Sequence, residues 1–247
     1  MKRIVTLLLM GLLLAGLLPG AALAANETFL LQAGTPWETT GYVVDSGEAG
    51  PTALILGGVH GNEPAGAAAA EQVLAFKPVR GKLVVIPRVN RPGLQQSLRY
   101  LTGAGDMNRA YPPTGEDTPA NRMGAAIIEL MNRRNIAMLI DLHEARTFHK
   151  VDRTSLGQTL LFADNVASTG LAMDTVDVVN RRIADDVVKF SLVGHPIPSS
   201  AAWYAGKYLG IAAFTVETSS RQPLADRVQQ HLLVVRELLA AGGWLAR

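Results

Sequence analysis

A histidine and a glutamate stand three residues apart where an apolar segment ends. His60 and Glu63 frame the sequence His-Gly-Asn-Glu, which follows the apolar run 52–58. A second apolar run, 137–142, ends at His143. Two neutral imidazoles and one carboxylate are a ligand set of catalytic zinc, because three protein ligands leave one coordination position open for water. The residue types therefore predict one Zn²⁺ ion held by His60, Glu63 and His143.

Taken alone, the His-x-x-Glu spacing is equally compatible with a solvated turn, because so short a motif also arises by chance. The elements around it favour the metal site. Short apolar runs of the kind buried on both faces of a sheet alternate with segments of helical spacing, which predicts a largely parallel sheet covered by helices. The expected strands are 52–56, 82–86, 137–142, 159–162 and 211–216, the expected helices are 64–76, 121–134, 173–190 and 224–241, and strands 27–32 and 39–44 form an edge hairpin.

In such a sheet the functional groups gather at the carboxyl ends of the strands. His60 and Glu63 follow the first core strand, His143 closes the third, and Glu217 closes the last. We therefore expect a single α/β domain, with a central mixed, largely parallel sheet flanked by helices, that brings these four residues to one edge.

Hydrolysis of an amide also needs a base that takes a proton from water and later delivers it to the leaving amine. Glu217 is the candidate, since partial burial at the end of an apolar strand raises the pKa of a carboxyl group. Glu144 is its rival because it neighbours His143. Adjacent residues of a strand face opposite ways, however, so Glu144 is expected to point away from the metal if His143 points toward it.

A second group of polar residues lies in segment 99–112. Arg109 could hold a substrate carboxylate with its planar guanidinium, and Arg99 could stabilise the oxyanion that develops during attack. Asp106 could accept the distal N–H of a metal-bound imidazole. The alternative is a polar surface loop that turns before Pro112.

Together these residues resemble the zinc carboxypeptidases with their succinylglutamate desuccinylase and aspartoacylase branch. The shared pattern is His-x-x-Glu after a glycine-rich strand end, then Asp-x-Asn-Arg, then a later His, then a Glu on a final core strand. The matching segments are Gly57–Glu63, Asp106–Arg109, Asp141–His143 and Phe214–Glu217, and they fall in the family order over residues 50–240.

The resemblance implies a zinc carboxypeptidase-like fold and a role for each matching residue. His60, Glu63 and His143 would bind zinc, and Glu217 would be the general base and acid. Asn108 and Arg109 would hold the substrate carboxylate, Arg99 would polarise the carbonyl group under attack, and Asp106 would support the first zinc histidine.

The same resemblance leaves two substrate classes open. The deacylase branch usually carries a C-terminal β domain over its site, and we expect a more open site here, which favours a peptide or another large acylated substrate. The compact Asp-x-Asn-Arg loop that runs into Tyr111 and Pro112 is more typical of the deacylase branch. The expected substrate is therefore a peptide, with cell-wall peptides among the candidates, or an N-acylated amino acid.

The N-terminal segment 1–24 has the features of a secretory signal: Lys2 and Arg3, an apolar stretch 4–18, and the small-residue site Ala22-Leu23-Ala24. The apolar stretch is shorter than a membrane span requires. We therefore expect cleavage, a catalytic domain over 25–247, a periplasmic or secreted location, and no stable membrane span afterwards.

Charge and cysteine content exclude other classes. Removing the signal takes away two of 23 basic residues and none of the 21 acidic ones, which leaves a neutral chain that is not expected to bind nucleic acid. The chain has no cysteine, so thiolate ligands and cysteine nucleophiles are ruled out. It also lacks the G-x-S-x-G elbow of serine α/β hydrolases. The remaining alternative to a zinc hydrolase is a non-catalytic protein of the same fold that binds zinc or peptides.

Overall fold

The computed structural model describes residues 26–247, so the predicted signal segment 1–24 lies outside the described residues. Within 26–247, none of the helices combines the length and the apolar character that crossing a membrane requires.

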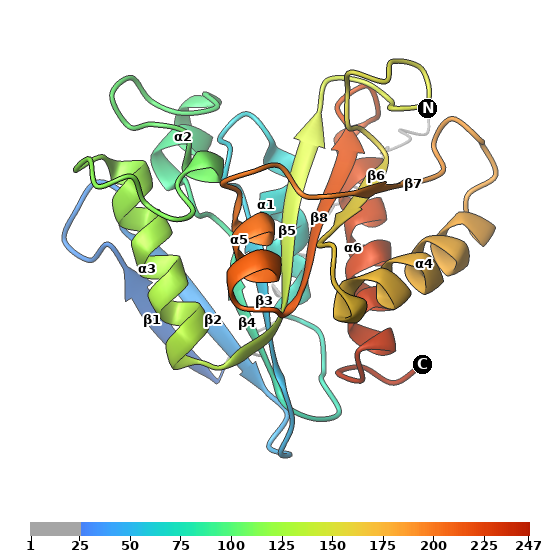
Figure 1. Cartoon of the computed structure of the whole chain (residues 1–247), viewed down its shortest axis with the longest axis horizontal. Coiled ribbons are helices and arrows are strands. Elements are labelled where there is room, and N and C mark those ends of the chain that lie inside the picture. Colours follow the sequence, from blue (N-terminus) through green and yellow to red (C-terminus); the bar gives the residue numbers. More distant parts are fainter. Residues whose placement is uncertain (1–25) are drawn as a thin grey trace, which may run out of the picture.

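An eight-stranded mixed sheet forms the centre of the molecule (Figure 1). Its strands are β1 (Glu27–Leu31), β2 (Thr39–Asp45), β3 (Thr52–Gly57), β4 (Lys82–Ile86), β5 (Ile136–Ala145), β6 (Thr159–Phe162), β7 (Ser191–Gly194) and β8 (Ala212–Ser219). They lie in the order β1-β2-β4-β3-β5-β8-β6-β7. The four central strands β4, β3, β5 and β8 run parallel, whereas β2 pairs antiparallel with β4 and β6 antiparallel with β8.

The central strands are buried on both faces because their apolar runs pack against a helical layer on each side. The helices are α1 (Pro64–Val73), α2 (Arg91–Gln96), α3 (Pro119–Arg133), α4 (Val166–Arg181), α5 (Ala201–Tyr208) and α6 (Leu224–Ala241), with the short 3₁₀ helix η1 (Met107–Arg109). One hydrophobic core lies between the sheet and α1, α4 and α6, and the other between the sheet and α3 and α5. Figure 1 shows α3 and α5 in front of the sheet and α1 and α6 behind it.

The predicted fold class is confirmed, and the edge hairpin is present as β1 and β2. The predicted helix 173–190 was wrong at both ends, since α4 begins at Val166 and ends at Arg181. Asn165 caps its start by accepting a hydrogen bond from Ser168 N at 2.8 Å. At the other end, the Asp185 side chain accepts a hydrogen bond from Val187 N in a turn that replaces further helix. Elements α2, η1, α5 and β7 were not predicted.

Candidate metal centre

Three neighbouring parallel strands bring the predicted residues to one edge of the sheet. His60 and Glu63 follow β3, and Glu63 is the residue that precedes α1. His143 lies near the end of β5, directly opposite Glu217 of β8 in the strand register. Because β5 lies between β3 and β8, residues that are distant in sequence meet in one place.

The loop from β3 to α1 can place both a histidine and a glutamate here because two glycines shape it. Gly58 has a φ of +64°, a conformation that glycine adopts without strain. A Cβ on Gly61 would come within 2.0 Å of the Gly93 carbonyl carbon, so only glycine allows α2 to approach this closely. The turn closes with a hydrogen bond from Glu63 N to His60 O at 3.2 Å.

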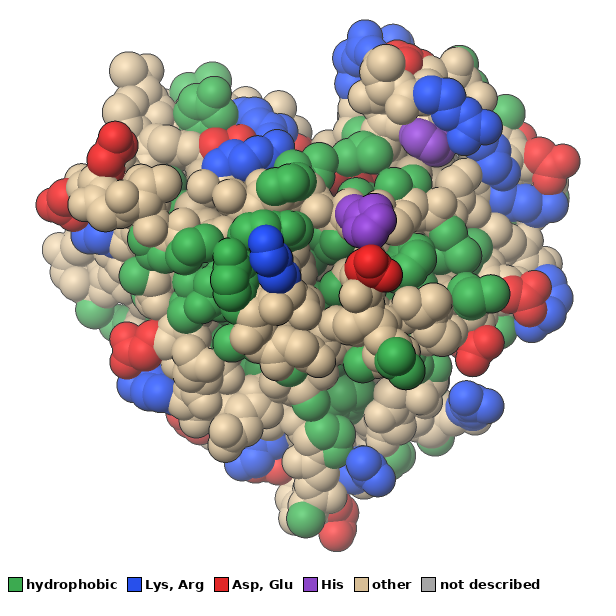
Figure 2. Space-filling view, viewed as in Figure 1, with side chains coloured by type: hydrophobic (Ala, Val, Ile, Leu, Met, Phe, Trp, Pro, Cys, Tyr) green, Lys and Arg blue, Asp and Glu red, His purple; other side chains and the backbone are tan. Residues whose placement is uncertain are grey.

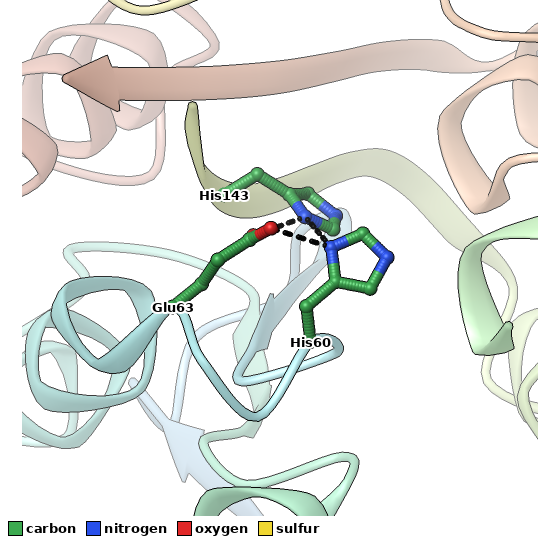
Figure 3. A group of neighbouring side chains, drawn as sticks. All are labelled: His60, Glu63 and His143. Atoms are coloured by element: carbon green, nitrogen blue, oxygen red, sulfur yellow. Dashed lines mark hydrogen bonds and ion pairs between the residues drawn. The ribbon is translucent and has the colours of Figure 1, made fainter. Parts of the chain in front are cut away.

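The side chains of His60, Glu63 and His143 converge (Figure 3). His60 Nδ1 lies 2.8 Å from Glu63 Oε1, His143 Nδ1 lies 2.9 Å from Glu63 Oε2, and the two Nδ1 atoms are 3.1 Å apart. Ligand atoms of a tetrahedral zinc site are roughly 3.3 Å apart when each bond to the metal is about 2.05 Å. The three buried groups could therefore hold a metal ion with only a small outward movement.

The outward-facing ring nitrogens contact carboxylates, which is the usual arrangement behind metal-binding imidazoles. His60 Nε2 lies 3.0 Å from Asp106 Oδ1, as predicted. His143 Nε2 lies 3.0 Å from Asp141 Oδ2, a contact that the sequence reasoning missed. The signal was present: Asp141 is the charged residue within an apolar strand, and a spacing of two puts it on the same face as His143.

In the metal-free protein, the charges within this group favour an ionised Glu63 and a protonated His143. Although burial opposes ionisation, the neighbouring His143 and His60 bring the pKa of Glu63 well below its ordinary value. Burial likewise lowers the pKa of His143, but Asp141 and Glu63 outweigh it and hold this pKa well above its ordinary value. A divalent cation among these donors would replace the proton that His143 otherwise carries.

Two of the three candidate metal ligands, His60 and Glu63, line a cavity of about 530 Å³ that is also lined by Arg99, Asn108, Arg109 and Glu217. Figure 2 shows a notch at the top of the molecule, above the place where Figure 1 shows the ends of β5 and β8. Glu217 is 9% exposed, and its Oε2 atom has no hydrogen-bond partner within residues 26–247. Burial, followed by the nearby charges of Glu63 and Asp141, raises the pKa of Glu217 to about 8, against the opposing influence of His143 and Arg99.

The predicted loop residues take different positions around the cavity. Arg99 reaches over the metal ligands, with Nη1 at 3.2 Å from Glu63 Oε1 and Nη2 at 3.3 Å from Asp106 Oδ2. Asn108 is buried, and its Nδ2 atom lies 3.3 Å from His143 Nε2. Arg109 is exposed at the cavity wall and donates to Asn108 O at 2.6 Å.

Asp106 has two functions within the loop. Its Oδ1 atom accepts a hydrogen bond from Asn108 N at 2.8 Å, which starts η1, and the same atom faces His60. Contact with the His60 ring lowers the pKa of Asp106 despite burial, which acts in the opposite direction. Segment 99–112 is therefore more than a polar surface loop, because the Asp106 carboxylate contacts His60 of the candidate metal centre.

Comparison with known families agrees with this geometry. Residues 49–241 match the model of the succinylglutamate desuccinylase/aspartoacylase catalytic domain. The chain belongs to this family. The match covers every residue of the metal centre and the whole sheet from β3 to β8.

One protein resembles a segment of this chain in sequence, and two solved structures resemble its fold. A segment of 82 residues is 37% identical to an N-alpha-acetyl-L-2,4-diaminobutyric acid deacetylase of Halomonas elongata, covering 31% of this chain and 24% of that protein. The mDAP-bound structure of Helicobacter pylori Csd4, a D,L-carboxypeptidase, has a TM-score of 0.70 at 23% identity over 79% of this chain and 51% of that one. The succinylglutamate desuccinylase/aspartoacylase of Rhodobacter sphaeroides has a TM-score of 0.64 at 20% identity, covering 85% and 60%.

These likenesses have limited reach. The chain spans about half the length of the Csd4 structures that it matches, and a quarter of the deacetylase. At these identities the two solved structures show a shared fold, whereas the family itself is shown by the match to the succinylglutamate desuccinylase/aspartoacylase catalytic domain.

Proposed function

We propose that this protein is an exported zinc hydrolase that cleaves an amide bond beside a free carboxylate group. The observation that carries the proposal is the convergence of three buried donor groups beside an open cavity that is lined by a second buried carboxyl, Glu217. His60, Glu63 and His143 would hold the ion. When bound, zinc would supply the Lewis acid that polarises a carbonyl group and makes water a better nucleophile.

Glu217 is the general base and acid in this proposal. It lies in the cavity with a free Oε2 atom, so a water molecule could approach that atom directly. A carboxyl group with a pKa near neutrality can take the proton of an attacking water and return it to the leaving amine nitrogen. One carboxyl group can therefore serve for both proton transfers, from the water and to the leaving amine.

The two arginines have separate tasks. Arg99 contacts Glu63, so its guanidinium lies beside the metal ligands, where it could stabilise the negative charge that develops on the carbonyl oxygen. Arg109 is exposed at the cavity wall, and its planar guanidinium suits two parallel hydrogen bonds to a substrate carboxylate. Asn108 adjoins both Arg109 and His143, and its Oδ1 atom has no partner among the described residues.

The substrate would be a peptide or an N-acylated amino acid, because both present an amide bond near a carboxylate. The similar proteins support each class, since one is named a D,L-carboxypeptidase and another an N-alpha-acetyl-L-2,4-diaminobutyric acid deacetylase. Export rests on the predicted signal at residues 1–24, and it makes cell-wall peptides natural candidates.

The proposal is tested by mass spectrometry of products after the zinc-loaded protein is incubated with short peptides and N-acyl amino acids. Release of a C-terminal residue would identify a carboxypeptidase, and release of an acyl group would identify a deacylase. Glu217→Gln should abolish either product while zinc binding persists. Tight peptide binding with no product from the unmodified protein would instead support a non-catalytic binding protein. Equal turnover by Glu217→Gln would refute the role of Glu217.

A further inference from the structure

Glu144 is a buried carboxylate beside the metal centre that takes no part in the ligand set described above. It follows His143 on β5 and is one of the residues that line the cavity, but its carboxylate is directed toward α1 and α6. Only 7% of the residue is exposed. Both carboxylate oxygens are occupied, because Oε1 accepts a hydrogen bond from Ala65 N at 2.6 Å and Oε2 accepts one from Arg227 of α6.

The backbone of the same residue holds the metal ligand itself. Glu144 N donates a hydrogen bond to Glu63 Oε2 at 3.0 Å. Residue 144 therefore contacts the loop between β3 and α1 twice, at the Glu63 carboxylate through its backbone and at Ala65 through its side chain.

Helix α1 explains why this second contact is needed. The residue at its N-cap position is Glu63, which makes no side-chain capping bond because its carboxylate faces the two histidines. An uncapped first turn leaves backbone N–H groups without partners, and a negative charge is favoured at that end of a helix. Pro64 has no N–H to donate, and the N–H of Ala65 finds its acceptor in the side chain of Glu144 on β5.

Arg227 fixes the position of Glu144 in turn. Its side chain is 13% exposed and reaches Glu144 from α6, the helix that packs beside α1 behind the sheet (Figure 1). A buried carboxylate needs a partner of opposite charge, and loss of one member leaves the other charge buried and uncompensated. Burial raises the pKa of Glu144, and the contact with Arg227 opposes this shift and so favours the charged carboxylate at the start of α1.

We propose that Glu144 is a positioning residue that caps α1 in place of Glu63 and thereby holds Glu63 in the geometry that a metal ion requires, with Arg227 as its counter-ion. The inference rests on the proposed zinc site. It assigns to Glu144 and Arg227 a role that the matching family segments of the sequence do not include. Removal of the cap frees the loop that carries Glu63, so the metal affinity falls although all three ligands remain.

The test is the zinc dissociation constant, measured by competition with a chromophoric chelator for Glu144→Gln, Glu144→Ala and Arg227→Met. Glutamine keeps an acceptor for Ala65 N but loses the charge, whereas alanine loses both. Substitutions behind metal ligands typically weaken metal binding about 10- to 100-fold. We expect Glu144→Ala to fall in that range and Glu144→Gln to lie between it and the unmodified protein.

Glu237→Gln is the matched control. Glu237 lies on α6, as Arg227 does, but pairs with Arg182 at the end of α4, at 3.1 Å. This variant should bind zinc with unchanged affinity, even where its thermal stability falls. The visible absorption of the cobalt-loaded proteins adds a readout of ligand geometry, and it should change in the Glu144 and Arg227 variants but not in Glu237→Gln.

Circular dichroism selects the variants that are folded at the assay temperature, and the glutamine variant decides the matter if the alanine variant does not fold. Zinc affinity within twofold of the unmodified protein in folded Glu144 variants, with an unchanged cobalt spectrum, would overturn the inference. Absence of zinc binding by the unmodified protein would overturn the zinc site itself, and the positioning role with it.

Discussion

Replacing Glu217 with glutamine should stabilise the metal-free protein, although it should abolish catalysis. Glu217 is a buried carboxyl group whose Oε2 atom has no partner among residues 26–247, and burial raises its pKa to about 8. In the unfolded chain this carboxyl has its ordinary pKa of 4.5. Between these two values the folded protein keeps the proton that the unfolded chain releases, so its free energy of unfolding falls as the pH rises.

The size of the effect follows from the gap between the two pKa values. In the unfolded chain, pH 7 is 2.5 units above the carboxyl pKa of 4.5, and each unit corresponds to about 1.36 kcal/mol. Glu217 therefore lowers the free energy of unfolding by about 3 kcal/mol at pH 7, and by under about 1 kcal/mol at pH 5. Glutamine has nearly the shape of the protonated acid and cannot ionise, so it avoids this loss.

The assay is urea unfolding of both proteins in the presence of a chelator, at intervals between pH 5 and pH 8. The quantity of interest is the difference in unfolding free energy between Glu217→Gln and the unmodified protein, because titrating groups that do not interact with Glu217 cancel in that difference. It should grow by about 2 kcal/mol or more from pH 5 to pH 7. Glu129→Gln, a substitution on the exposed face of α3, is the control for the general effect of replacing a glutamate. A difference that does not change with pH for Glu217→Gln would refute the reasoning.

Three further predictions concern the metal centre and the packing behind it. Asp141→Asn should weaken zinc binding about 10- to 100-fold in a chelator competition, because a neutral amide orients the neighbouring imidazole less well. A zinc concentration 1,000 times the dissociation constant should stabilise the protein by about 4 kcal/mol in thermal or urea unfolding, and Glu63→Gln should remove most of this gain. Gly66→Ala should destabilise the protein by more than about 2 kcal/mol, since a Cβ there would lie 2.4 Å from Leu142 O, whereas Gly170→Ala in α4 should stabilise it by about 0.5 to 1 kcal/mol.

Each of these predictions has an outcome that contradicts it. Unchanged zinc affinity in Asp141→Asn would show that the contact with the His143 ring has no positioning role. Equal zinc stabilisation of Glu63→Gln would place the ion elsewhere. Equal unfolding midpoints for the two glycine variants would mean that α1 can move away from β5 without cost, since no atom lies within 4 Å of a Cβ on Gly170.

The core of the fold was predictable because its central strands are uninterrupted runs of apolar residues. Runs such as 52–56 and 82–86 are apolar at every position but the first, and they form β3 and β4 with nearly the expected ends. The short elements were not predictable in the same way. Helix α5 and strand β7 are only eight and four residues long, and β7 alternates between intermediate and exposed positions, so its conformation depends on pairing with β6.

The part of the site that lies at the carboxyl ends of the parallel strands was predictable. His60, Glu63, His143 and Glu217 were placed together by the rule that parallel strands share one functional edge, and the structure brings them there. The sequence could not show that β8 lies between β5 and β6, nor that α6 would bring Arg227 to the metal loop. Both depend on how distant segments pack, which residue spacing does not encode.

The position of β8 in the sheet also separates two events during folding. All three donor residues belong to the first 143 residues, whereas Glu217 arrives with the strand that must insert between β5 and β6. Pairing of segments so distant along the chain is slow, and β5 has an unpaired edge until it occurs. A chain in which β8 has not yet inserted would therefore hold its three candidate ion-binding residues together without Glu217, so binding of an ion would not have to wait for the strand that carries the proposed proton-transfer group.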